Sequence, residues 1–337
     1  MTRSRLVISI AFSLAIASLA LLQVQPVRSW QDKLEPQKGR PVVVPTRFSG
    51  NRFVVVPVTT EEVTLALLAD SAGGLFLYQD TVERLKLTPE VVPGDEGRQL
   101  RVVSLPAFKP DHSIPPPLGS PFQQRVFVFP REKISASFLE TRDGILGQQW
   151  FADRVWTFDY PGKKLLWRAA GDIPAHEKSH EVSLGFKTSG SGRRQNNFAR
   201  IAIEVDGETL DFVLDTGATN VISEEQKKSL GDSLPRERGT SFLVRSVYEK
   251  WHAKHPEWRA FEMKTLTGGA MIEVPEIKIG GYTVGPVWFT VQPDFGFQAV
   301  MKTLMDKPIV GALGGSALHY FELTVDWPNA IAVFHKP

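Results

Sequence analysis

The chain has 337 residues, of which 42% are hydrophobic and 23% charged, and its 39 basic and 37 acidic side chains leave a net charge of +2. This composition is that of a globular protein, and the length suggests two domains. Charges so close to balance do not provide the basic surface expected of a nucleic-acid-binding protein. The chain has no cysteine, which excludes disulfides, thiol catalysis and a lipoprotein anchor.

The first 29 residues have the pattern of an export signal. Arg3 and Arg5 precede an uncharged apolar run over residues 6–22, and Ser29 provides a small residue before a cleavage site. The run is long for the core of a signal peptide, so an uncleaved N-terminal membrane anchor is the alternative. We expect an exported protein, either periplasmic or secreted, or one held on the inner membrane by this segment.

Two aspartates farther along share one local pattern. Asp70 lies in Leu68-Ala69-Asp70-Ser71-Ala72-Gly73-Gly74, and Asp215 lies in Val213-Leu214-Asp215-Thr216-Gly217-Ala218-Thr219. In both stretches an apolar run ends in the aspartate, and a hydroxyl residue and small residues follow. One carboxylate cannot serve as general acid and general base at once, whereas a facing pair that shares one proton can.

An internal repeat surrounds these aspartates. Gly144-Ile145-Leu146-Gly147 is echoed by Gly311-Ala312-Leu313-Gly314, and twelve residues beyond each motif stands another aspartate, Asp159 or Asp326. The separation is 167 residues both from 147 to 314 and from 159 to 326. An aromatic residue, a proline and an apolar strand follow each of these aspartates. Two features in one register indicate a duplicated architecture.

The remaining patterns are mostly those of strands. Asp206-Gly207 separates apolar segments at 200–205 and 209–214, which predicts a tight hairpin. Asp70 and Asp215 are 145 residues apart, so the second copy carries about 22 extra residues between its aspartate and its glycine-rich motif. We place this insertion within residues 232–261, with a helix over 241–254 that Pro256 ends.

The Asp-Thr-Gly-Ala-Thr stretch after an apolar strand, together with its downstream glycine-rich motif, resembles aspartic peptidases of the retropepsin and pepsin kind. The resemblance covers most of residues 45–337. It implies a mainly β protein of two tandem retropepsin-like β-barrel lobes about a pseudo-twofold axis, with a short helical insertion in lobe two. The expected lobes are 45–170 and 199–337, joined by a linker and polar loop at 171–198.

The resemblance also implies a role for each motif residue. Asp70 and Asp215 would form a catalytic dyad that activates water to hydrolyse a peptide bond in a peptide or protein substrate. The hydroxyls of Ser71 and Thr216 would fix the two loops, and the backbone N–H groups of Ala72 and Gly217 would approach the carboxylates. This chemistry needs no metal and no cofactor, and two fused lobes imply a monomer.

Lobe one departs from the family pattern because Ala72 stands where glycine is usual. A degenerate first lobe would make the chain a non-catalytic peptide- or ligand-binding protein on the same fold. A third reading is a homodimer joined through lobe two alone, although the fused first lobe would occupy the partner's position.

A flap should cover the cleft and exclude water. The candidate is residues 265–271 with Gly268 and Gly269, and residues 93–97 hold the comparable place in lobe one. The pair His252 and His255 lacks a third ligand nearby in sequence and is interpreted as a solvated helix face rather than a metal site.

Overall fold

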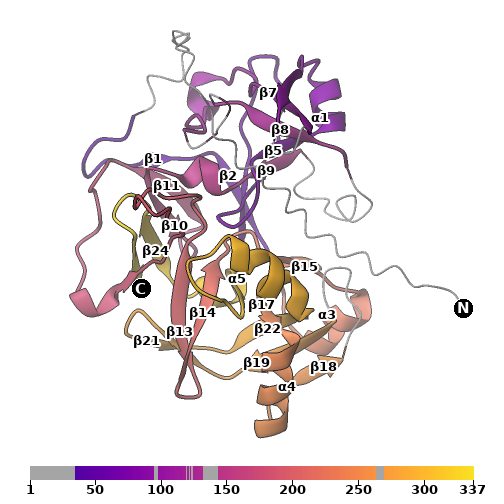
Figure 1. The fold of residues 1–337 in the computed structure, drawn as a ribbon, viewed down its shortest axis with the longest axis vertical. Coiled ribbons are helices and arrows are strands. Elements are labelled where there is room, and N and C mark those ends of the chain that lie inside the picture. The colour runs from indigo at the N-terminus through magenta and orange to yellow at the C-terminus, as the bar shows by residue number, and fades with distance from the viewer. Residues whose placement is uncertain are drawn as a thin grey trace, which may run out of the picture.

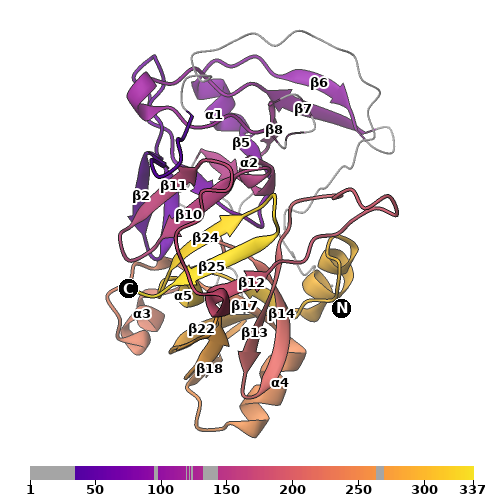
Figure 2. The same cartoon turned by 90° about the vertical axis from the view of Figure 1, so that its left-hand side faces the viewer.

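The computed structural model describes residues 35–337 apart from 95–97, 119, 121, 123, 132–142 and 263–268. It is mainly β, with an eight-stranded sheet at one end, a nine-stranded sheet at the other and a six-stranded sheet between them (Figures 1 and 2). We call the parts built on the eight-stranded and nine-stranded sheets lobe one and lobe two. The duplicated, mainly β architecture predicted from the sequence is confirmed.

The sheet of lobe one contains the strand that leads to Asp70. In spatial order its strands are β2 (Thr46–Ser49), β3 (Arg52–Val55), β4 (Leu67–Ala69), β9 (Gly144–Leu146), β5 (Phe76–Tyr78), β8 (Val126–Phe129), β7 (Gln99–Val103) and β6 (Glu90–Pro93).

The sheet of lobe two contains the strand that leads to Asp215. In spatial order its strands are β18 (Ala260–Glu262), β19 (Ala270–Val274), β22 (Val287–Gln292), β17 (Ser241–Val244), β23 (Gly311–Leu313), β14 (Glu208–Leu214), β13 (Arg200–Val205), β20 (Ile277–Ile279) and β21 (Tyr282–Val284).

The six-stranded sheet takes strands from both copies of the repeat. Its order is β1 (Val42–Val43), β11 (Lys164–Arg168), β10 (Val155–Asp159), β24 (Glu322–Asp326), β25 (Ile331–His335) and β12 (Glu181–Ser183). Because the closing hairpins of the two copies pair with each other, the halves share backbone hydrogen bonds. The division at residues 45–170, 171–198 and 199–337 stays a prediction.

The helices are short. They are α1 (Gln79–Arg84), α2 (Gln148–Phe151), α3 (Glu224–Leu230), α4 (Arg245–Lys254) and α5 (Gly315–Leu318), with single turns at Pro110–His112, Lys178–His180, Gly296–Val300 and Met301–Thr303. Helix α3 begins at a capping box made by Ser223 and Gln226 and ends at Gly231 in the left-handed conformation. The predicted hairpin turn is also present, with positive φ at Asp206 and Gly207 between β13 and β14.

Within the described residues neither lobe closes into the barrel that we expected, because each sheet has two ends in its strand order. The central arrangement is instead the same in both lobes. Strands β4, β9 and β5 lie side by side in lobe one, and β14, β23 and β17 do so in lobe two, with parallel and then antiparallel pairing each time.

This correspondence corrects the position of the insertion. Phe76 pairs with Ile145, and Phe242 pairs with Ala312 at the equivalent place. The extra residues of lobe two therefore lie before Phe242. They form β15 (Thr219–Val221), α3 and β16 (Glu237–Gly239), and the two strands pair antiparallel so that the excursion closes on itself. It is a helical insertion in lobe two, as expected, but an earlier one.

The helix predicted over 241–254 is shorter than expected. Residues Ser241–Val244 form β17 and only Arg245–Lys254 is helical. Helix α4 follows β17 as α1 follows β5, so it is a counterpart of α1 rather than an addition. Tyr248 and Trp251 are buried in the core, and the helix ends just before Pro256 as predicted.

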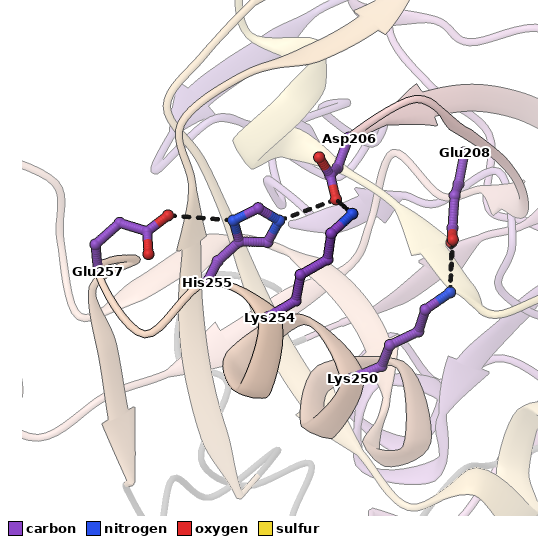
Figure 3. Close-up of polar contacts among 6 residues, drawn as sticks. All are labelled: Asp206, Glu208, Lys250, Lys254, His255 and Glu257. Atoms are coloured by element: carbon purple, nitrogen blue, oxygen red, sulfur yellow. Dashed lines mark hydrogen bonds and ion pairs between the residues drawn. The ribbon is translucent and has the colours of Figure 1, made fainter.

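The C-terminal end of α4 is tied to the β13–β14 turn by charged side chains (Figure 3). Asp206 accepts from Lys254 and is 2.9 Å from Nε2 of His255, while Glu208 pairs with Lys250 at 2.6 Å. The Nδ1 atom of His255 is 3.1 Å from Glu257. These contacts lie at the far end of lobe two from the shared sheet.

One hydrophobic core runs through both lobes and the shared sheet. Its largest fully buried members around the shared sheet are Trp150, Phe151, Trp156 and Trp327, and the rings of Phe151 and Trp327 stack at 5.3 Å. Such burial supplies most of the stability of a chain without disulfides. Among the described residues, no helix is both long and apolar enough to cross a membrane.

Candidate active site

Each aspartate stands at the end of the central strand of its lobe. Asp70 follows β4 and its N–H donates to Leu146 O at 3.1 Å, while Asp215 follows β14 and donates to Leu313 O at 2.9 Å. The two loops therefore begin with the same backbone geometry against the same apolar-apolar-glycine motif.

The last glycine of each motif lets the aspartate loop lie directly on the motif. A Cβ at Gly147 would lie 2.2 Å from the carbonyl oxygens of Gly73 and Gly74. A Cβ at Gly314 would lie 2.1 Å from Thr240 O and 2.9 Å from Asp215 O. Glycine is needed at both places because any side chain would push the aspartate loop away.

The two loops hold each other through a reciprocal set of hydrogen bonds across the lobes. Ser71 Oγ donates to Leu214 O at 2.7 Å and accepts from Thr216 N at 3.0 Å. Thr216 Oγ1 donates to Ala69 O at 2.9 Å and accepts from Ser71 N at 3.1 Å. Both hydroxyls are fully buried, so each bond is made away from competing water and the loops are fixed face to face.

This arrangement brings the two carboxyl groups together. The side chains of Asp70 and Asp215 are hydrogen-bonded to each other. Ala72 N donates to Asp70 Oδ1 at 3.0 Å, and Gly217 N donates to Asp215 Oδ1 at 3.1 Å. A hydrogen bond between two carboxyl groups requires one proton on the pair.

The surroundings make that proton hard to remove. Burial raises the pKa of Asp215 well above its usual value, and the negative charge of Asp70 raises the pKa of Asp215 further. Burial also raises the pKa of Asp70, although the hydrogen bonds from Asp215 and from the backbone of Ala72 and Gly73 oppose that effect. Both aspartates remain partly accessible to solvent, which gives water a route to the pair.

Residues 72 and 217 have different surroundings even though their loops match. A Cβ at Gly217 would lie 2.3 Å from Asp70 Cγ, so glycine at this position makes room for the facing carboxyl. Ala72 instead belongs to a buried hydrophobic cluster that includes Phe198, Val213 and Met301. The methyl group of Ala72 is therefore accommodated, and its N–H makes the same hydrogen bond as that of Gly217.

The predicted flap positions lie largely outside the described residues. Residues 265–268, which include Gly268, and residues 95–97 are not described. Gly269 lies just before β19 and donates to Val291 O at 3.1 Å, and along the chain the lobe-two candidate stands between β18 and β19. The lobe-one candidate joins β6 to β7. A covering role for either loop stays a prediction.

The described residues contain no group of three or more His, Asp or Glu side chains placed to hold a metal ion. His252 stacks on Tyr248, and His255 faces Asp206 and Glu257, so the two imidazoles have separate environments.

Sequence reasoning missed Arg52 and Thr219, which connect lobe one to the Asp215 loop. The available signal was a lone arginine that opens the apolar run of β3, but sequence alone gives no partner for it.

The chain is similar to solved structures but not to curated sequences. No protein-family profile and no curated protein sequence matches the chain. Similar solved structures include the aspartic proteinase from Irpex lacteus, with TM-score 0.48 and 14% identity over 88% of this chain and 97% of that one. The structure titled edgp has TM-score 0.44 and 11% identity over 87% and 94%.

Conglutin gamma, described as a basic 7S globulin from lupine seeds, has TM-score 0.45 and 10% identity over 88% of this chain and 95% of its own. At these TM-scores and identities the likenesses carry no argument about chemistry.

Proposed function

We propose that this chain is an aspartic endopeptidase in which Asp70 and Asp215 activate a water molecule at the junction of the two lobes. The observation that carries the proposal is that the two carboxyl groups meet at the lobe junction, where Ala72 N donates to Asp70 Oδ1 and Gly217 N donates to Asp215 Oδ1, and where burial raises both pKa values. Strongly shifted acids in mutual contact are typical of functional sites. The buried, reciprocal bonds of Ser71 and Thr216 support it, since they keep the pair in place.

In the proposed reaction Asp215, which has the more strongly raised pKa, holds the shared proton and Asp70 is ionised. Asp70 removes a proton from water as the water oxygen bonds to the scissile carbonyl carbon, and Asp215 protonates the carbonyl oxygen. The resulting diol then breaks its C–N bond. Asp70 returns its proton to the leaving amine and Asp215 regains one from a diol hydroxyl, which restores the starting state.

The test is hydrolysis of a peptide pool by purified residues 30–337 across the acid range, followed by mass spectrometry. We expect acid-favoured cleavage that a statine-type transition-state mimic blocks. Asp70→Asn and Asp215→Asn should each lower kcat/KM by at least about a thousandfold, because one carboxyl cannot perform both proton transfers. The control is Asp111→Asn, an exposed aspartate outside the site, which should retain full activity.

The same experiment separates the alternatives. A chain that binds peptides but cleaves none of the pool is a binding protein on this fold, the reading suggested by Ala72. If Asp70→Asn left the rate intact while Asp215→Asn abolished it, the homodimer through lobe two would replace the fused pair. The bonds between Ser71 and Thr216 favour the fused pair, because lobe one already occupies the facing position.

We also propose that the protein is exported by its N-terminal segment and acts as a monomer on peptide or protein substrates. The support is the charged start and apolar run over residues 6–22. N-terminal sequencing of the protein from cell fractions tests this. A soluble species beginning at Trp30 is expected, whereas an intact apolar run in the membrane fraction would indicate the anchor instead.

A further inference from the structure

Lobe one contains a buried arginine that reaches across to the loop of Asp215. Arg52, the first residue of β3, is fully buried. Its Nη1 donates to Thr219 Oγ1 at 3.1 Å and to Glu237 Oε1 at 2.9 Å, and its Nη2 donates to Glu237 O at 3.0 Å. Thr219 and Glu237 are the first residues of β15 and β16, so the arginine contacts both strands of the lobe-two insertion.

The hydrogen bonds continue from Thr219 to the aspartate. Thr219 Oγ1 accepts from Arg52 and donates to Gly217 O at 2.7 Å. Gly217 N in turn donates to Asp215 Oδ1 at 3.1 Å. Gly217 is also the residue whose missing Cβ makes room for Asp70. The position of this one glycine thus affects both carboxyl groups.

The Asp70 loop cannot make the equivalent side-chain hydrogen bond at the corresponding position. Thr219 stands four residues after Asp215. Gly74 stands four residues after Asp70, and it has no side chain to accept or donate a hydrogen bond. The two aspartate loops are therefore braced differently even though their backbones match. A rigid scaffold around a reacting pair is what keeps its geometry within the narrow range that catalysis requires.

We propose that Arg52 and Thr219 are positioning residues, which hold the Asp215 loop from the opposite lobe and so set the geometry of the carboxyl pair. The inference deepens the proposed function and rests on it for its kinetic consequence. Its structural consequence, a change in how the pair titrates, does not require that the protein cleave peptides.

The sharpest variant is Thr219→Val, which removes the hydroxyl but keeps the Arg52–Glu237 ion pair. Thr219→Ser restores the hydroxyl, and Thr283→Val is a matched control at an exposed position on β21. We expect Thr219→Val to lower kcat about tenfold with little change in KM, since the loss falls on the reacting geometry rather than on substrate binding. Thr219→Ser should recover most of the rate.

The second measurement is the titration of aspartates labelled with 13C at the carboxyl carbon, followed by NMR. The raised titration of the Asp70–Asp215 pair should shift in Thr219→Val, return in Thr219→Ser and be unchanged in Thr283→Val. A merely structural role would lower stability in Thr219→Val without moving this titration. If Thr219→Val does not fold, Arg52→Lys, which keeps the charge but loses the two-pronged contact, takes its place.

The outcomes distinguish this inference from the proposed function. A shifted titration in a protein that cleaves no peptide would uphold the positioning role and refute the peptidase. Peptide cleavage with the same kcat and the same titration in Thr219→Val as in the unaltered chain would overturn the positioning role and leave the peptidase standing.

Discussion

Thr157 and Thr324 stand 167 residues apart, pair directly across β10 and β24, and join their hydroxyls by a 2.7 Å hydrogen bond. They occupy the same position in the two copies of the repeat, so the pseudo-twofold axis passes between them. Thr157 Oγ1 also accepts from Arg168 Nε at 2.6 Å. Both threonines are buried, so neither hydroxyl has water as a ready substitute.

The first prediction concerns this pair. Thr324→Val should destabilise the protein by about 1–2 kcal/mol, because the buried Thr157 hydroxyl then loses one of its two hydrogen-bond partners and keeps only Arg168. Adding Thr157→Val should cost less than the two single changes together. Denaturant unfolding of the single and double variants measures the coupling, and strictly additive losses would show that the hydroxyls do not interact.

The second prediction concerns stability and pH at the carboxyl pair. Because the pKa of Asp215 is raised in the folded state, the stability linked to its protonation is present below its unfolded value of 3.8 and is lost as pH rises through the folded value. Asn cannot ionise, so Asp215→Asn does not lose this stability as the pH rises. The variant should therefore unfold at a higher temperature than the unaltered chain near neutral pH, and the difference should shrink in acid.

Calorimetric melting across the pH range tests this while the same samples are assayed for peptide cleavage. An Asp215→Asn variant that is inactive but more stable near neutral pH would support the prediction that ionisation of Asp215 beside Asp70 destabilises the fold. A variant that is equally destabilised at every pH would instead indicate that Asp215 has only a packing role.

The third prediction contrasts two changes at equivalent positions. Gly217→Ala should lower kcat/KM by at least about a hundredfold, because its Cβ would lie 2.3 Å from Asp70 Cγ and must displace that carboxyl. Ala72→Gly should retain activity, since Ala72 N already makes the required hydrogen bond. Its cost should appear in thermal stability, through the methyl lost from a buried cluster. Equal kinetic effects of the two changes would contradict this asymmetry.

The fourth prediction concerns His255 at the end of α4 (Figure 3). The hydrogen bond to Asp206, followed by that to Glu257, raises the pKa of His255 above 6.5. A raised pKa of a histidine means that its stabilising contribution is present below about pH 6.5 and is lost as pH rises through the folded value. His255→Gln should therefore be less stable than the unaltered chain in acid, and the difference should disappear in alkali. Unfolding midpoints across the pH range measure this, and a constant difference would refute the linkage.

The sequence by itself determined the duplication, and it predicted that the two aspartates would face each other. The two copies of the repeat are offset by 167 residues in the sequence. In the shared sheet this same offset relates directly paired residues, since Thr157 lies opposite Thr324. The glycines at 147 and 314 were recognisable because close backbone approach excludes every side chain. The repeat and its two glycine-rich motifs are patterns of residue types along the chain, so they can be recognised before any contact between the lobes is known.

Only the tertiary structure decided the features that depend on contacts between distant segments. The insertion could be counted from the sequence but not placed, since the pairing of Phe242 with Ala312 shows where the extra residues end. The accommodation of Ala72 depends on which surfaces the two lobes bring together. The partners of Arg52 lie 167 and 185 residues away. A buried charge requires a compensating partner, but the identity of that partner depends on which segments the fold brings together.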